Sequence, residues 1–215
     1  MILPLPQLSR RYILIDIDTQ RNILLAEGDS SIRNQRKVLA NIRRVMAWAR
    51  YGNIPVISTA EVCHDKCLTT ISHCIEVSEG QRKIAYTLLS NRAVFPADGM
   101  NFLPADLLQA HKQVILHKRS IDPFDEPRLD RLLSETQADE FILIGANTEG
   151  AVKATALGLL QRRKNVRIVI DAIDSHTERE AELALHKMQI KGARLLVTEN
   201  LAGVSPLRQS AQNKV

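Results

Sequence analysis

Acidic and basic side chains follow three apolar segments of the chain, at the positions where predicted strands end. Asp18 closes the first segment, Glu61 follows the second, and Lys118 closes a later one. Because ligands bind outside the carboxyl ends of parallel strands, these three groups would meet at one edge of a sheet. Any one of these charged residues could simply be a solvated surface residue. This explanation is less satisfactory when all three lie at strand ends. A carboxyl group beside a lysine can stay ionised or deliver a proton, so the positions predict acid–base chemistry.

A further acid, Asp16, lies two residues before Asp18. Strand alternation would place both side chains on the same face, so either could be the acid of the site. Alternatively, Asp16 is a structural carboxylate held by backbone N–H groups or by a neighbouring arginine.

Apolar runs rich in isoleucine and valine alternate with segments of helical period along the chain. Such runs are typical of strands buried on both faces, and the periodic segments of amphipathic helices. Residues 63–104 show only fragments of either pattern. The alternation predicts an α/β fold: a three-layer, doubly wound, mainly parallel sheet of about six strands with helices on both faces. The predicted strands are 12–18, 54–59, 114–118, 141–145, 166–171 and 194–198, and the predicted helices 32–51, about 129–133, 148–163 and 177–190.

The composition predicts one globular domain over residues 1–215, with 205–215 as a frayed tail. Apolar residues make up 45% of the chain, which excludes wholesale disorder, and no apolar run is long enough to span a membrane. Three cysteines, an odd number, argue against a disulfide framework and for a cytoplasmic location. The net charge of +5 would attract an anionic small molecule as readily as nucleic acid. The aromatic content of 4% argues against stacking platforms for single-stranded nucleic acid, and we expect no nucleic-acid partner.

Five short motifs resemble, in order and spacing, those of the isochorismatase-like (cysteine hydrolase) superfamily. They are Asp18-Thr-Gln20-Arg21, Lys118 with Phe124 six residues later, Gly145-Ala-Asn-Thr148, Asp171-Ala172 and Thr198-Glu-Asn-Leu201. The set extends from about Tyr12 to Leu201. It favours Asp18 over Asp16 as the acid, because only Asp18 begins the D-x-Q motif of the family.

The resemblance implies a role for each matching residue. Asp18 and Lys118 would be catalytic, and Ala151 stands where amidase members carry a nucleophilic cysteine. A methyl group cannot attack a carbonyl carbon, so the thioester route is closed at this position. We also predict the cis peptide bond that the family often has, here at Ala146–Asn147. The positions expected to contact substrate are Gln20, Glu61, Ala146, Asn147, Thr148 and Gly150.

Three functions are compatible with this set of residues. The first resembles isochorismatases proper, which have glycine in place of the cysteine and in which an aspartate is thought to protonate a vinyl ether. The substrate would be a small anionic metabolite, although Glu61 would repel it unless protonated or paired. The second is a cysteine amidohydrolase whose nucleophile has been replaced by Ala151, and the third is a non-catalytic metabolite-binding relative. The resemblance also implies a homo-oligomer, and we expect no cofactor.

A group of metal-capable side chains lies between the second strand and the ill-defined region, at Cys63, His64, Cys67, His73 and Cys74. The D-x-H…H spacing through which nicotinamidases of this family bind a metal is absent. The three cysteines would share one face of a helix, where free cysteine is a small buried apolar residue. We therefore expect no metal site here.

Overall fold

The computed structural model describes residues 11–25, 34–62, 81–175 and 177–203. Within these ranges the chain forms a seven-stranded sheet of order β3-β4-β2-β1-β5-β6-β7, in which every adjacent pair of strands is parallel. The predicted α/β fold with a parallel sheet is confirmed. The strands are β1 (Tyr12–Ile17), β2 (Val56–Glu61), β3 (Arg92–Phe95), β4 (Gln113–Lys118), β5 (Glu140–Ala146), β6 (Val166–Asp174) and β7 (Arg194–Leu196).

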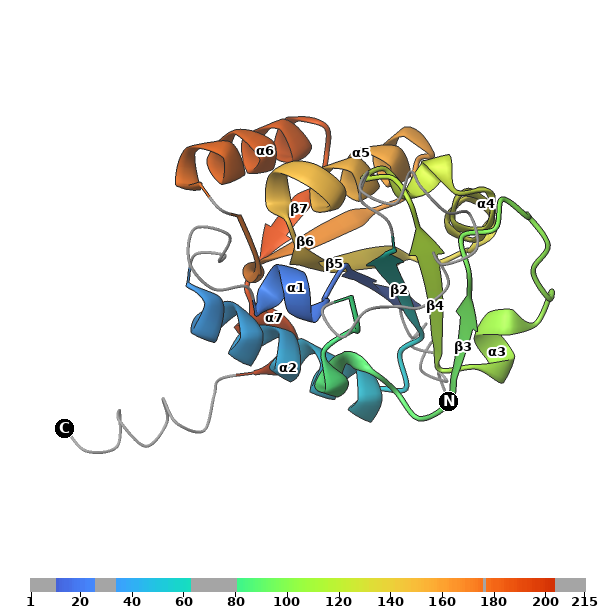
Figure 1. Cartoon of the computed structure of the whole chain (residues 1–215). Helices are drawn as coiled ribbons and strands as arrows, with labels where there is room; N and C mark the ends of the chain where they lie inside the picture. The colour runs from blue at the N-terminus through green and yellow to red at the C-terminus, as the bar shows by residue number, and fades with distance from the viewer. Residues whose placement is uncertain (1–10, 26–33, 63–80, 176, 204–215) are drawn as a thin grey trace, which may run out of the picture.

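Helices cover both faces of the sheet and complete three layers (Figure 1). Helices α4, α5 and α6 lie on one face, and α1, α2 and α7 lie on the other. The helices are α1 (Arg21–Leu24), α2 (Gln35–Tyr51), α3 (Leu107–Ala110), α4 (Pro127–Glu135), α5 (Lys153–Gln161), α6 (Glu178–Ile190) and α7 (Thr198–Ala202), with short helical turns η2 (Ala85–Thr87), η3 (Pro123–Asp125) and η4 (Thr148–Val152).

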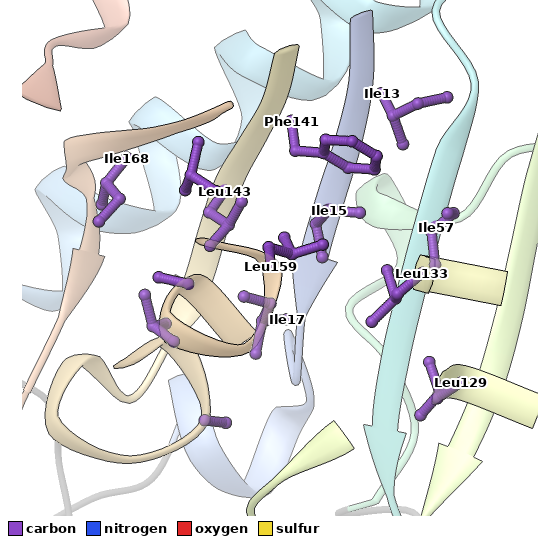
Figure 2. Packing of buried hydrophobic residues seen from close by; sticks show 14 of the residues in the cluster. Ile13, Ile15, Ile17, Ile57, Leu129, Leu133, Phe141, Leu143, Leu159 and Ile168 are labelled. Atoms are coloured by element: carbon purple, nitrogen blue, oxygen red, sulfur yellow. The ribbon is translucent and has the colours of Figure 1, made fainter. Parts of the chain in front are cut away.

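The central strands are apolar without interruption because side chains on both of their faces are buried. In β1, Ile13, Ile15 and Ile17 contribute to the core beneath α4, α5 and α6, whereas Leu14 contributes to the core beneath α2. Figure 2 shows these isoleucines beside Phe141 of β5 and Leu159 of α5. The continuous apolar runs in the sequence are therefore explained by a helical layer on each side.

The structure adds one strand to the six that the sequence predicted. Strand β3 lies at the edge of the sheet and pairs only with β4, and its side chains alternate between exposed and half-buried positions. Such a short, half-solvated strand has no apolar run to reveal it. The predicted strand 194–198 is also shorter than expected, because the chain leaves the sheet after Leu196 and begins α7 at Thr198.

The expected tail at 205–215 lies outside the described residues. In the part of the chain that the structure does describe, no helix combines the length and apolar character needed to cross a bilayer.

Gly145 allows β1 and β5 to approach closely at the carboxyl edge of the sheet. It lies opposite Ile17 in the register of the two strands and has a φ of 122°. A Cβ atom at this position would overlap the backbone carbonyl of Ile17. Because Ile17 directly precedes Asp18, this close approach helps to fix where Asp18 leaves the sheet.

Replacing Gly145 by alanine is expected to destabilise the fold by at least about 3 kcal/mol, since it adds a clash with backbone to an unfavourable φ. Gly99→Ala is the matched control, because Gly99 also has a positive φ, of 76°, but has open space around its Cα. It should cost only about 1 kcal/mol. Urea denaturation of both variants measures the difference, and equal losses would contradict the clash.

Candidate functional site

An acid and a lysine form a buried ion pair at the carboxyl edge of the sheet. Asp18 Oδ2 lies 2.8 Å from Lys118 Nζ, and the two side chains are 2% and 0% exposed. Asp18 follows β1 and Lys118 ends β4, on either side of β2 in the sheet. The contact that the sequence predicted between these two strand ends is therefore present.

Asp18 is oriented by its own backbone and by Thr59 of β2. Its φ of 47° lies in the left-handed region, which aspartate tolerates better than most residues. The Thr59 hydroxyl accepts a hydrogen bond from the Asp18 N–H at 3.2 Å and donates one to Asp18 Oδ1 at 2.6 Å. One carboxylate oxygen thus faces a hydroxyl while the other faces the lysine.

Lys118 has three oxygen partners around its buried ammonium group. Besides Asp18, Nζ contacts Glu61 Oε2 at 3.4 Å and donates to the carbonyl of Ser120 at 2.9 Å. An ammonium has three N–H donors, so this set uses its full capacity. Glu61 lies opposite Lys118 in the β2–β4 register, so strand pairing itself brings the second carboxylate to the lysine.

The loop after Lys118 is fixed to helix α5 by Phe124. Asp122 Oδ1 accepts a hydrogen bond from the Phe124 N–H at 3.0 Å, which forms the turn η3. The Phe124 ring packs against Gly158, where a Cβ would overlap it, and the Arg162 guanidinium lies 3.9 Å above the ring. This contact holds the loop that supplies the Ser120 carbonyl.

Gln20, which we expected to contact substrate, is engaged with backbone on all sides. Its Oε1 accepts from the N–H of Glu61 at 2.7 Å, and its Nε2 donates to the carbonyls of Glu61 and Gln81 at 2.8 and 2.7 Å. The side chain is fully buried. In this arrangement Gln20 fixes the end of β2 beside the ion pair.

The turn after β5 carries the other residues that the sequence predicted. The peptide bond Ala146–Asn147 is cis, which confirms that prediction. Gly150 has a non-helical backbone (φ −106°, ψ −107°), and a Cβ there would overlap the Asn147 side chain. Thr148 and Ala151 are buried in the turn η4, directly before α5.

Asp16 does not share the surroundings of Asp18, contrary to the expectation from strand alternation. Asp16 Oδ2 accepts from Ser58 Oγ at 2.8 Å and pairs with Lys83 Nζ at 3.0 Å. The alternation of β1 places Asp16 with Leu14 on the α2 face, and the left-handed backbone of Asp18 then turns the second carboxylate towards Lys118. The partner of Asp16 is a lysine, neither a backbone N–H nor an arginine.

Two titratable groups close to this second pair have shifted pKa values. Burial, and then the Asp16 carboxylate, raise the pKa of Tyr86 to about 12, against an opposing effect of Arg43. Burial, and then the charge of Lys83, lower the pKa of His117 from its ordinary value. Both side chains are half-buried, and burial is the larger cause of each shift.

A cavity among the described residues lies away from the ion pairs. It has a volume of about 800 Å³ and opens at the amino ends of the strands, beside Tyr12, Trp48, Pro55, Leu107 and Leu132. It contains none of the residues of the Asp18–Lys118 cluster. We therefore place the candidate site by its ionisable groups and not by cavity size.

No group of three or more potential metal ligands occurs within the part of the chain that the structure describes. The cluster Cys63, His64, Cys67, His73 and Cys74 falls outside that part.

The family follows from a comparison that covers almost all of these elements. A model of the isochorismatase domain matches residues 12–200, from the start of β1 into α7. The chain belongs to the isochorismatase family. Two of the sequence motifs, those that begin at Asp171 and at Thr198, contact each other in this fold. Asp171 Oδ1 accepts hydrogen bonds from both the N–H and the hydroxyl of Thr198 at 2.8 Å, which is a structural role.

Relatives of known sequence or structure resemble this isochorismatase domain to different extents. Isochorismatase domain-containing protein 2B of Mus musculus is 35% identical over 82 residues, which are 38% of each chain, so the match spans well under half of that relative's length. An isochorismatase family protein from Desulfovibrio vulgaris is 19% identical with a TM-score of 0.68, covering 90% of this chain and 97% of the other. The YcaC gene product of Escherichia coli, an octameric hydrolase of unknown specificity, is 19% identical with a TM-score of 0.64, covering 94% and 82%. At these identities the two structures support the fold.

The lowered pKa of His117 predicts a stability that falls in mild acid. Below about pH 6.5, His117 is protonated in the unfolded chain but stays neutral in the native protein, because its native pKa is lowered. Acid therefore favours unfolding. The free energy of unfolding should fall by up to about 1.4 kcal/mol per pH unit more in the wild type than in His117→Gln between pH 7.5 and 5.5. Urea titrations at both pH values measure this, and parallel losses in the two proteins would rule it out.

Proposed function

We propose that this protein is a hydrolase that acts on a small anionic metabolite by acid–base chemistry of Asp18 and Lys118, without a cysteine nucleophile. The observation that carries the proposal is the buried 2.8 Å contact between Asp18 Oδ2 and Lys118 Nζ. Asp18 is the candidate acid, and Ala151 occupies the position at which amidases of the family carry cysteine. The family assignment supports hydrolysis as the reaction class.

In the proposed reaction Asp18 is protonated when the substrate is bound, and it gives this proton to the carbon of a vinyl ether. The resulting oxocarbenium ion takes a water molecule, which returns a proton to the carboxylate as the new C–O bond forms. The hemiketal then breaks into a ketone and an alcohol. Lys118 stabilises the carboxylate that exists between the two proton transfers, and the Thr59 hydroxyl keeps Asp18 oriented throughout.

The charges around Lys118 limit how an anionic substrate can be held. Asp18 and Glu61 both contact the one ammonium group, so Lys118 offers little attraction to a third negative charge. A substrate carboxylate would be better received by the amino-terminal end of α5, which the turn η4 directly precedes. Asn147, Thr148 and Gly150 are therefore proposed as substrate contacts, together with the cis-linked Ala146, whereas Gln20 and Glu61 shape the edge of β2.

A second candidate is a cysteine amidohydrolase that has lost its nucleophile. The turn 146–151 favours this alternative, because Gly150 keeps a non-helical backbone directly before a residue with no functional group. A non-catalytic relative that binds a metabolite would use the same residues of the carboxyl edge.

We also propose that the protein forms a homo-oligomer. Support comes from YcaC, which has the same fold and is octameric. Sedimentation velocity of the full chain measures the assembly directly.

A hydrolysis panel of vinyl ethers, amides and small esters tests the function. Asp18→Asn is expected to lower kcat by about 10²–10⁴-fold, because it removes the proton donor while keeping the shape of the side chain. Asp139→Asn is the matched control, since Asp139 directly precedes β5 at the opposite edge of the sheet, where it accepts a hydrogen bond from the Arg11 N–H. It should leave kcat unchanged.

Ala151→Cys separates the two enzyme candidates on the same panel. Turnover by the wild type that disappears in Asp18→Asn supports acid catalysis without a nucleophile. A silent wild type together with amide hydrolysis by Ala151→Cys would replace this proposal by the disabled amidohydrolase. If all of the proteins are silent, the metabolite-binding alternative takes its place.

A further inference from the structure

A second buried ion pair, Asp16–Lys83, lies under the same edge of the sheet and has no part in the proposed reaction. The carboxylate and ammonium groups are 3.0 Å apart, with side chains 0% and 4% exposed. Lys83 belongs to the region in which the sequence shows no clear pattern. Removing two charged groups from water costs desolvation free energy, so a buried ion pair is weak evidence for a role in stability alone. The contacts of Lys83 indicate another role for this pair.

Lys83 also reaches the strand that orients the candidate acid. Its Nζ donates to the backbone carbonyl of Thr59 at 3.0 Å. The register between β1 and β2 ends one residue earlier, where Asp16 lies opposite Ser58. Thr59 is therefore the first residue of β2 beyond the pairing with β1, and on this side Lys83 bonds its carbonyl, whereas β4 still pairs with it on the other side.

Thr59 passes this restraint to Asp18 through its hydroxyl. Oγ1 accepts from the Asp18 N–H and donates to Asp18 Oδ1, so a shift of Thr59 would alter both bonds. One continuous set of contacts therefore runs from Asp16 through Lys83 and Thr59 to Asp18, and onward to Lys118.

The backbone around Lys83 is joined to the turn that follows Asp18. The N–H of Ile84 donates to the carbonyl of Thr19 at 2.9 Å, and the N–H of Arg21 donates to the carbonyl of Arg82 at 3.0 Å. The two segments thus run antiparallel beside each other. Both the main chain and the side chain of Lys83 restrain the surroundings of Asp18.

We propose that Lys83 is a positioning residue that holds Thr59 so that its hydroxyl aims the carboxyl group of Asp18. This role rests on the proposed function, in which Asp18 is the acid. A small displacement of a reacting group can cost about 10²-fold in rate. Loss of the Asp16–Lys83 pair should therefore lower kcat by about 10–100-fold, with KM within about threefold of the wild type.

The test removes both charges together, because a lone buried carboxylate would destabilise the fold by itself. It compares the wild type with Asp16→Asn/Lys83→Met, with Thr59→Val and with the triple variant. Thr198→Val is the matched control, since it deletes another buried hydroxyl, which contacts Asp171 but neither Asp16 nor Asp18. Thermal melting confirms that each protein is folded.

The first readout needs no substrate. Hydrogen exchange of the Asp18 backbone amide, followed by NMR, should become at least about tenfold faster in Asp16→Asn/Lys83→Met and should stay within about twofold of the wild type in Thr198→Val. An unchanged exchange rate in the double variant overturns the positioning role, whatever the protein hydrolyses.

The second readout is a double-mutant cycle on kcat. If Lys83 acts through Thr59, the triple variant will be no slower than Thr59→Val alone, because the two changes remove one effect. If the triple variant instead shows a loss of kcat equal to the product of the two separate losses, Lys83 acts by another route, and the inference is overturned. Faster amide exchange in a protein that hydrolyses nothing on the panel would support the positioning role and count against the proposed hydrolase.

Discussion

The arrangement of the carboxyl edge depends on the burial of one ammonium group. Lys118 is among the largest fully buried side chains, and its charge is tolerated because three oxygens surround it. Removing one partner of such a pair leaves an uncompensated charge, at a typical cost of about 3–5 kcal/mol. The register of β2 with β4, the left-handed turn at Asp18 and the loop at Ser120 are each needed to bring an oxygen to this point.

Two buried lysines at this edge pair with two different aspartates, Lys83 with Asp16 and Lys118 with Asp18. The backbone of β1 and of the residue after it explains how these pairs are kept apart. Strand β1 delivers Asp16 to the α2 face, and the backbone then turns so that the next acid meets a lysine of the other face. Serine and threonine at neighbouring positions of β2 show the same division, Ser58 binding Asp16 and Thr59 binding Asp18. Two acids only two residues apart can therefore have different partners and different roles.

Much of this could be predicted from the sequence because it depends on strand ends. Uninterrupted apolar runs reveal buried parallel strands, and the residues at their carboxyl ends must gather at one edge, so Asp18, Glu61 and Lys118 were identified together. Lys83 was missed because it lies in a segment without periodicity and reaches the site through tertiary contacts. The expectation that Asp16 and Asp18 share one face was wrong because Asp18, which has a positive φ, ends the alternation on which that prediction depended.

Phe124 couples the loop after Lys118 to helix α5, so that the two cannot be changed independently. Its ring joins the loop after Lys118 to helix α5, which starts directly after the turn that carries Ala151, and the fit leaves no room for a side chain at Gly158. Loop and helix thus form one interlocked unit, and neither could be transplanted or lengthened without redesigning the other. For an engineer who wishes to change what this domain accepts, the useful library would vary the two together and leave the aromatic ring and its glycine untouched.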